Sequence, residues 1–128
     1  RIRDFVTDAE PEHPGTIDLK KFGVRLFTDA ARVFALARQV EATNTVARLR
    51  RTGPMMNMSS EEVAASLEGF NFIQLLRLRH QHFEQEHGRA GDNLVRPVEL
   101  NEIERHILKE SFRQARKLQG RLKLDYQL

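Results

Sequence analysis

Two arginines, two histidines and a glutamine gather within nine residues, LLRLRHQHF, at positions 75–83. An arginine can bind a phosphate or a carboxylate through two parallel hydrogen bonds, and a histidine can donate or accept a proton. The surrounding sequence reads as a buried helix, in which a polar group without a partner costs free energy. The stretch therefore predicts either an internal polar network or a ligand site.

A carboxylate in a corresponding position occurs in the last predicted helix. Glu104 falls on the apolar stripe of that helix, one turn from Leu108, so it should pair with Arg32, Arg77 or Arg79. One interpretation is a structural salt-bridge network that fixes the register of the helices. The other is a polar cavity for an anionic or hydrogen-bonding ligand at the end of the bundle.

Metal binding and catalysis receive little support from the residue types. Glu84 and His87 form an E-x-x-H pair, which is half of a di-iron motif, but the chain has no second copy. His80 and His82 diverge on a helix, and there is no cysteine to bind a metal as a thiolate. The G-x-S-x-G, glycine-rich phosphate-loop and H-E-x-x-H motifs are absent. We expect neither a metal site nor a catalytic activity in this chain alone.

Basic residues gather in two places, although the net charge is only +3. One row on the last helix, opposite its apolar stripe, consists of Arg105, Lys109, Arg113, Arg116 and Lys123. A second cluster consists of Arg48, Arg50 and Arg51. The plainer interpretation is a solvated face, and the alternative is a phosphate-contacting or domain-docking surface. A nucleic-acid partner is not expected, because one tyrosine and no tryptophan leave few platforms for base stacking.

The elements that position these residues fit into one domain, since the chain has 128 residues. No apolar run approaches the ~20 residues of a membrane span, and no signal peptide is visible. We therefore expect no membrane partner and a cytoplasmic location. The chain does not begin with methionine, and we expect it to be a piece of a longer protein.

The first 15 residues end in EPEHPG, a stretch of turn and helix-breaking residues. This predicts a linker or edge segment from an upstream domain at 1–15, followed by a single helical-bundle domain at 16–128. From Thr16 the spacing predicts a first helix, with Asp29 and Arg32 at the border of its apolar stripe. The stripe consists of Leu19, Phe22, Leu26, Ala30, Val33 and Ala37, widened by Phe27 and Phe34.

A second, short helix should begin with Thr43 or Asn44 as its N-cap and end before Gly53-Pro54. The residues SSEE (59–62) form a capping box, which predicts a long third helix to about His87. Apolar residues lie nearly all round this helix, so it should be the central one.

The C-terminal half of the central helix should present polar side chains on a covered face. The direction of Val63, Leu67 and Phe70 continues to Gln74, Arg77 and Gln81. The other polar side chains, Arg79 and His82, should project elsewhere, close to Phe72, Leu75 and Phe83.

Asn101 and Glu104 repeat the capping pattern and open a last helix that runs towards Tyr126. Its predicted apolar face consists of Ile103, Ile107, Phe112, Ala115, Leu118, Leu122 and Tyr126. No stretch of useful length alternates with period two, so no sheet is expected in the main body. The predicted fold class is all-α: an up-and-down bundle of four main helices.

Four blocks of sequence, taken together, resemble one known family. The blocks are IDLKKFGVRLFTDAARVFAL (17–36), NTVARL (44–49), LEGFNFIQLLRLRHQ (67–81) and DNLVRPVELNEIERHILKESFRQARKLQGRL (92–122). They resemble, in the same order, the C-terminal helical domain of bacterial signal-transduction proteins that carry nucleotidyltransferase, CBS-pair and often cyclic-nucleotide-binding domains upstream. That domain is regarded as the substrate-binding domain of the nucleotidyltransferase, and the resemblance covers about 17–126.

The resemblance implies a bundle packed against a nucleotidyltransferase domain that holds the catalytic aspartates. This arrangement is similar to that of the uridylyl- and adenylyltransferases that modify nitrogen-signalling proteins. The resemblance implies no cofactor in this chain, and magnesium and a nucleoside triphosphate for the parent protein. The implied partners are the upstream nucleotidyltransferase and regulatory domains of the same chain, with a protein acceptor and a second copy of the chain as further candidates.

Carried over position by position, the resemblance covers the polar residues Asp29, Arg32, Asn44, Arg48, Arg77, Arg79, His80, Gln81, Asp92, Asn93, Glu104 and Arg105. A substrate-binding role is expected for Arg77, Arg79, His80, Gln81, Arg32, Asp29, Asn93 and Glu104. In this hypothesis the arginines contact a phosphate or an acidic acceptor, while Glu104 and Asp29 hold the arginines in place. No catalytic or metal-binding residue is assigned.

Three functions remain open at this point. The first is a non-catalytic accessory domain that helps bind nucleotide or acceptor beside the catalytic domain. The second is a structural or regulatory docking or dimerisation module without a ligand site of its own. The third has His80 donating a catalytic group to a composite site, for which it would have to face the neighbouring domain. An open cleft with unpaired arginines favours the first function, and a sealed network of salt bridges favours the second.

Overall fold

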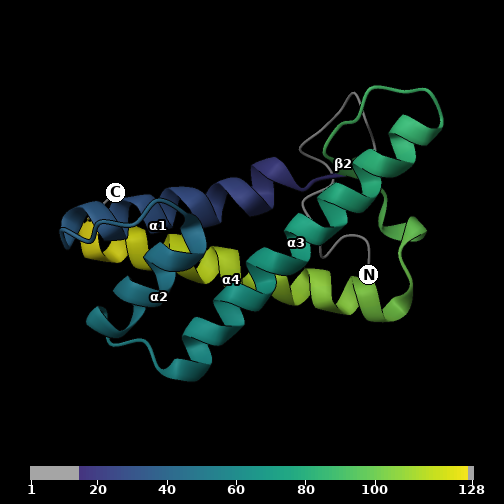
Figure 1. Cartoon of the computed structure of the whole chain (residues 1–128). Coiled ribbons are helices and arrows are strands. Elements are labelled where there is room, and N and C mark those ends of the chain that lie inside the picture. The colour runs from purple at the N-terminus through teal and green to yellow at the C-terminus, as the bar shows by residue number, and fades with distance from the viewer. Residues whose placement is uncertain (1–14, 127–128) are drawn as a thin grey trace.

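The computed structural model describes residues 15–126, and in this range four α-helices pack into a bundle (Figure 1). The helices are α1 (Arg25–Ala37), α2 (Thr45–Met55), α3 (Ser60–Glu86) and α4 (Glu102–Tyr126). The predicted all-α bundle of four main helices is therefore confirmed. The predicted linker falls almost entirely on residues 1–14, which lie outside the described range.

The start of the domain differs from the helix predicted at Thr16. Strand β1 (Ile17–Asp18) pairs antiparallel with β2 (Leu94–Val95), and a π-helical turn follows at Lys20–Val24. The Asp18 carboxylate accepts the first two backbone N–H groups of that turn, at 3.0 and 2.9 Å, so helical winding begins only after Asp18. The prediction of no sheet was wrong for these two strands, because two-residue strands are too short to show alternation.

The predicted starts of the second, third and last helices are confirmed by their hydrogen bonds. The Asn44 side chain accepts the backbone N–H three residues further on at 2.8 Å, and Ser59 and Glu62 form a reciprocal capping box. Asn101 and Glu104 exchange the same two bonds before α4, at 2.8 and 3.0 Å. Each motif needs only residues three apart, so the local sequence is sufficient to predict it.

The end of α2 lies beyond the predicted stop at Gly53-Pro54. The helix continues to Met55 and ends where Asn57 takes a left-handed φ of 62°. The N–H groups of Asn57 and of the next residue donate to the carbonyls of Pro54 and Gly53, the closing pattern of a left-handed helix terminus. Gly53 instead allows α2 to approach α3, since an added Cβ would lie 2.5 Å from Val63 Cγ2.

The core lies where α1, α3 and α4 meet. Phe27 and Phe34 of α1 are fully buried, although the predicted stripe placed them only at its edge. On α4 the predicted apolar face was wrong at its start, because Ile103 and Ile107 are exposed. The buried residues of α4 lie between Leu108 and Leu118, so Ile103 and Ile107 precede the part of the helix that its neighbours cover.

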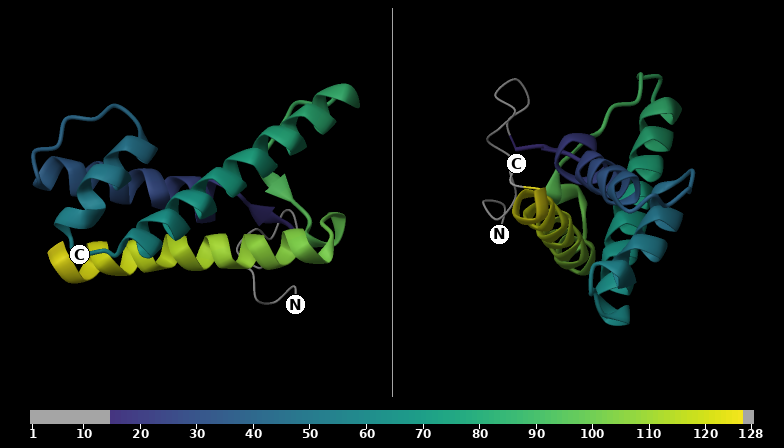
Figure 2. Two further views of the ribbon diagram at one scale, coloured as in Figure 1. Left: turned by 60° about the horizontal axis from the view of Figure 1, so that its bottom comes forward. Right: turned by 90° about the vertical axis from the view of Figure 1, so that its left-hand side faces the viewer.

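The helices α3 and α4 cross closely and then diverge. Gly69 of α3 lies against Ser111 of α4, where an added Cβ would come within 3.2 Å of Ser111 Cα. Small residues at this crossing allow the two backbones to approach. Towards the end of α3 the helices separate, and the connection from β2 through the short helix Pro97–Glu99 runs between them (Figure 2, left). This divergence positions the site described next.

Candidate functional site

A cleft of about 510 Å³ opens where α3 and α4 diverge. Its lining comes from the C-terminal half of α3, from β2, from the segment that leads into α4 and from the first turn of α4. The lining residues are Leu76, Arg79, His80, Phe83, Val95, Glu99, Leu100 and Glu104. Apolar side chains and a few polar groups that converge on one cavity are typical of a small-molecule site.

Arg79 and Glu104 join α3 to α4 across the cleft. Arg79 Nη1 donates to Glu104 Oε2 at 2.5 Å, and Glu104 Oε1 accepts the backbone N–H of Asn101 at 3.0 Å. These two hydrogen bonds, that from Arg79 foremost, lower the pKa of Glu104 below its usual 4.5. The predicted pairing of Glu104 with an arginine is confirmed. The Arg79 side chain is still 51% exposed, so its remaining N–H groups are open to a ligand.

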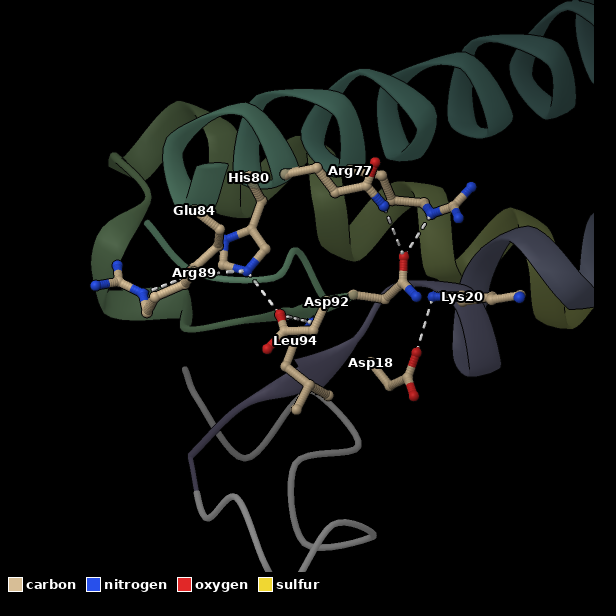
Figure 3. A network of polar contacts seen from close by, with 10 residues as sticks. Asp18, Lys20, Arg77, His80, Glu84, Arg89, Asp92 and Leu94 are labelled. Atoms are coloured by element: carbon tan, nitrogen blue, oxygen red, sulfur yellow. Dashed lines mark hydrogen bonds and ion pairs between the residues drawn. The ribbon is translucent and has the colours of Figure 1, made fainter. Parts of the chain in front are cut away.

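His80 connects α3 to the loop before β2. Its Nε2 lies 2.8 Å from Asp92 Oδ1 and 3.6 Å from Glu84 Oε1, and the side chain is 11% exposed. Arg89 donates to the same glutamate, and Asp92 accepts the backbone N–H of Leu94 at 3.0 Å. Figure 3 shows these side chains linking the end of α3 to the loop below it. The two carboxylates therefore hold the His80 ring in a fixed orientation at one wall of the cleft.

Arg77 lies on another face of α3, and its hydrogen bonds within residues 15–126 go to neutral groups. Its Nε donates to Asn93 Oδ1 at 2.9 Å and its Nη1 to Gln74 Oε1 at 2.7 Å. Gln81 Nε2 donates weakly to the same Asn93 oxygen at 3.5 Å, and the Asn93 carbonyl accepts the N–H of Leu19 at 2.8 Å. The predicted common direction of the two glutamines and Arg77 is confirmed by these contacts.

The structure divides the eight predicted substrate-binding residues into three groups. The cleft is lined by Arg79, His80 and Glu104; the group beside the loop consists of Arg77, Gln81 and Asn93; and the exposed surface of α1 carries Asp29 and Arg32. Within residues 15–126, no hydrogen bond or ion pair joins the α1 residues to either other group. Arg77 and Arg79 point about 200° apart around the helix, so one ligand group cannot face both.

Sequence reasoning did not assign five of the lining residues to a site. These are Leu76, Phe83, Val95, Glu99 and Leu100. Two signals could have found three of them: Glu99 and Leu100 directly precede the capping box that positions Glu104, and Phe83 follows Arg79 by one helical turn.

Several basic residues close loops or pair with a neighbour rather than forming one open face. Arg48 and Arg51 donate to backbone carbonyls of the loop before α2, and Arg105 donates to two carbonyls of the segment before α4. Arg113 forms two hydrogen bonds with Glu110, at 2.9 and 2.7 Å. These contacts support a structural role for four of the predicted basic residues.

Residues 15–126 contain neither a cluster of metal ligands nor a membrane-spanning helix. No group of three or more His, Asp and Glu side chains in this range could hold a metal ion, and none of its helices is both long and apolar enough to cross a membrane. The fold defines a class, that of all-α helical bundle domains, and this domain has a cleft between two of its helices.

The comparison with known families narrows this class. Residues 1–126 match the family described as "Putative nucleotidyltransferase substrate binding domain", and the chain belongs to that family. No curated protein and no solved structure matches the chain. The membership predicted from the four sequence blocks is therefore confirmed at the level of a nucleotidyltransferase substrate-binding domain.

Proposed function

We propose that this chain is a non-catalytic accessory domain of a signal-transduction nucleotidyltransferase, and that it holds the nucleotide or the acceptor substrate in the cleft between α3 and α4. Catalytic aspartates, magnesium and a nucleoside triphosphate belong to the upstream catalytic domain in this proposal. The observation that carries the proposal is the cleft, because its volume of about 510 Å³ and mixed lining suit a small ligand. The substrate-binding description of the family supports the same role.

The lining of the cleft favours an uncharged part of a substrate over its phosphates. Leu76, Leu100 and the half-exposed Phe83 offer apolar contact, and Arg79 retains N–H donors. The charge of Arg79 is balanced by Glu104, and Glu99 adds a second carboxylate to the lining. A row of phosphates would therefore be repelled here, whereas a nucleobase, a ribose or a peptide segment would find both apolar contact and hydrogen bonds.

A thermal-shift screen of the 128-residue chain tests the nucleotide form of the proposal. Nucleosides and nucleoside mono-, di- and triphosphates are added with and without magnesium, and a ligand at roughly 100 times its Kd should add about 2.7 kcal/mol of stability. We expect a base-selective shift that Phe83→Ala removes. Leu36→Ala is the matched control, since Leu36 is also exposed but lies near the end of α1. A shift that survives Phe83→Ala contradicts the assignment of the cleft.

Steady-state kinetics of the intact transferase test the acceptor form. If the cleft holds one substrate, Phe83→Ala raises the KM for that substrate and leaves kcat nearly unchanged. Unchanged KM values for both nucleotide and acceptor contradict the proposal. A fall in kcat at constant KM on His80→Gln would instead support a catalytic contribution from His80.

A structural or regulatory docking module is the second candidate function, and one observation favours it. Four large apolar side chains on α3 and α4 are exposed near the Arg79–Glu104 pair: Leu75, Leu78, Ile103 and Ile107. Grouped exposed apolar residues often mark an interaction surface. In this function these side chains contact the catalytic domain or a second copy of the chain, and variants in the cleft leave substrate binding unchanged.

A further inference from the structure

We infer that Arg77 forms a phosphate-binding site at the junction of α3, the loop before β2 and β1. This site goes beyond the proposed function, because it lies on a different face of α3 from the cleft and Arg77 does not line the cleft. Its ligand is a phosphate group, either free or as part of a nucleotide.

Arg77 has no counter-charge among the described residues. Arg77 is half-buried, and no carboxylate between residues 15 and 126 forms an ion pair with it. The two other arginines in this part of the molecule are paired, Arg79 with Glu104 and Arg89 with Glu84. A partly desolvated cation without an anionic partner has lost hydration free energy that no ion pair offsets. Binding of an anion beside it is therefore favourable.

Two amide side chains fix the orientation of the Arg77 guanidinium. The amide oxygens of Asn93 and Gln74 accept from Arg77 Nε and Nη1, which fixes the plane of the guanidinium without neutralising it. Arg77 Nη2 makes no hydrogen bond within the described residues, and neither does the Asn93 amide nitrogen. A fixed guanidinium with open donors is suited to phosphate oxygens.

A second cationic side chain, that of Lys20, belongs to the same contact network. Figure 3 shows the side chains of Arg77 and Lys20 ending on the same side of the contact network. Lys20 is exposed, and its backbone N–H rather than its ammonium group is bound to Asp18. The ammonium group is therefore available to add to the positive potential beside Arg77.

A purely structural role for Arg77 is the alternative, since Asn93 also accepts the N–H of Leu19 and ties the loop to β1. The two roles respond in opposite ways to one substitution. Gln74→Glu keeps the shape of the side chain but gives Arg77 an internal carboxylate. If Arg77 has only a structural role, this change should stabilise the fold, because Arg77 is then both hydrogen-bonded and neutralised. An anion site is lost, because the carboxylate takes the place of the ligand charge.

The experiment is isothermal titration calorimetry of the 128-residue chain at low salt with tripolyphosphate and, separately, with nucleoside triphosphates. We expect both Gln74→Glu and Arg77→Gln to weaken tripolyphosphate binding about tenfold or more. Arg79→Gln is the matched control and should leave this binding unchanged. Equal affinity for tripolyphosphate and nucleotides assigns the site to phosphate alone, and tighter nucleotide binding assigns it to a nucleotide.

Two results overturn the inference. One is the absence of tripolyphosphate binding by the unmodified chain, and the other is unchanged binding by Gln74→Glu. Thermal unfolding of the same variants guards against misfolding, because Gln74→Glu should melt no lower than the unmodified chain. Phe83→Ala separates this inference from the proposed function, since it should impair the cleft and leave tripolyphosphate binding intact.

Discussion

At the scale of single residues, Glu104 shows how one carboxylate can serve two elements. One oxygen caps the start of α4 by accepting the Asn101 N–H, and the other accepts from Arg79 on α3. The same side chain therefore sets where α4 begins and how its first turn lies against α3. Because the two oxygens have different partners, replacing the carboxylate by an amide separates the two roles.

Glu104→Gln should destabilise the chain at neutral pH by about 0.5–1 kcal/mol, since it removes the ion pair with the half-exposed Arg79. The pKa of Glu104 is lowered by the Arg79 hydrogen bond first and by the Asn101 N–H second. A lowered folded-state pKa means that the stabilisation is complete above 4.5 and is lost as the pH falls through the lowered value. Urea unfolding should therefore show a difference between Glu104→Gln and the unmodified chain at pH 7 that vanishes in acid. A difference that persists in acid would contradict the ion-pair explanation.

Glu110 provides a second test on the surface of α4. Hydrogen bonds from Arg113 and then from Gln114 lower the pKa of Glu110 to about 2. Carboxyl NMR titration should show this low value, and Arg113→Gln should raise it towards 4.5. Because the folded-state pKa is lowered, the pair stabilises the fold above 4.5, and this stabilisation is lost as the pH falls towards 2. An unmodified Glu110 that titrates near 4.5 would exclude the pair.

At the scale of elements, the features that could be predicted from sequence are the local ones. The capping box at 59–62 and its repeat at Asn101 depend on residues three apart, and both are confirmed. The pairing of β1 with β2 could not be predicted, because it joins segments distant in sequence over two residues each. The same limit explains why Gly53 was taken for a stop: its close contact with Val63 of α3 is a tertiary one.

The candidate site follows the same rule. Helical spacing placed Gln74, Arg77 and Gln81 on one face and Arg79 on another, which the contacts confirm. The choice of Arg79 as partner of Glu104, and the cleft itself, depend on how α3 and α4 diverge beyond Gly69. That divergence is a property of helix packing, which a single helical pattern does not contain.

Gly23 is a glycine whose replacement tests the packing of the elements. It lies in the π-helical turn where an added Cβ would meet Ile73 Cδ1 at 2.9 Å and Phe112 Cε1 at 3.2 Å. Gly23→Ala should therefore destabilise the fold by about 1–3 kcal/mol through overpacking. Gly120→Ala is the matched control in α4, where nothing lies within 4 Å, and it should stabilise by about 0.5–1 kcal/mol. Urea unfolding of both variants measures the difference, and effects of the same sign would contradict the packing account.

At the scale of the whole molecule, the exposed apolar side chains are unevenly distributed. Leu75 and Leu78 on α3 are 58% and 66% exposed, and Ile103 and Ile107 on α4 are 71% and 38% exposed. All four lie within about one turn of Arg79 or Glu104, which join the two helices. Exposed apolar residues beside the Arg79–Glu104 ion pair suit contact with a second copy, because a two-fold interface brings the same surface of both copies together.

We predict that the isolated chain associates reversibly through this end, with the degree of association rising with concentration in analytical ultracentrifugation. Leu78→Glu should raise the dimer Kd about tenfold or more, since it places a charge in an apolar contact. Leu124→Glu is the control, because Leu124 is 82% exposed near the other end of α4 and should leave association unchanged. A chain that stays monomeric at every concentration, or that responds equally to both variants, would contradict self-association. The four apolar residues would then be the surface expected to contact the catalytic domain, and Leu78→Glu should weaken that contact instead.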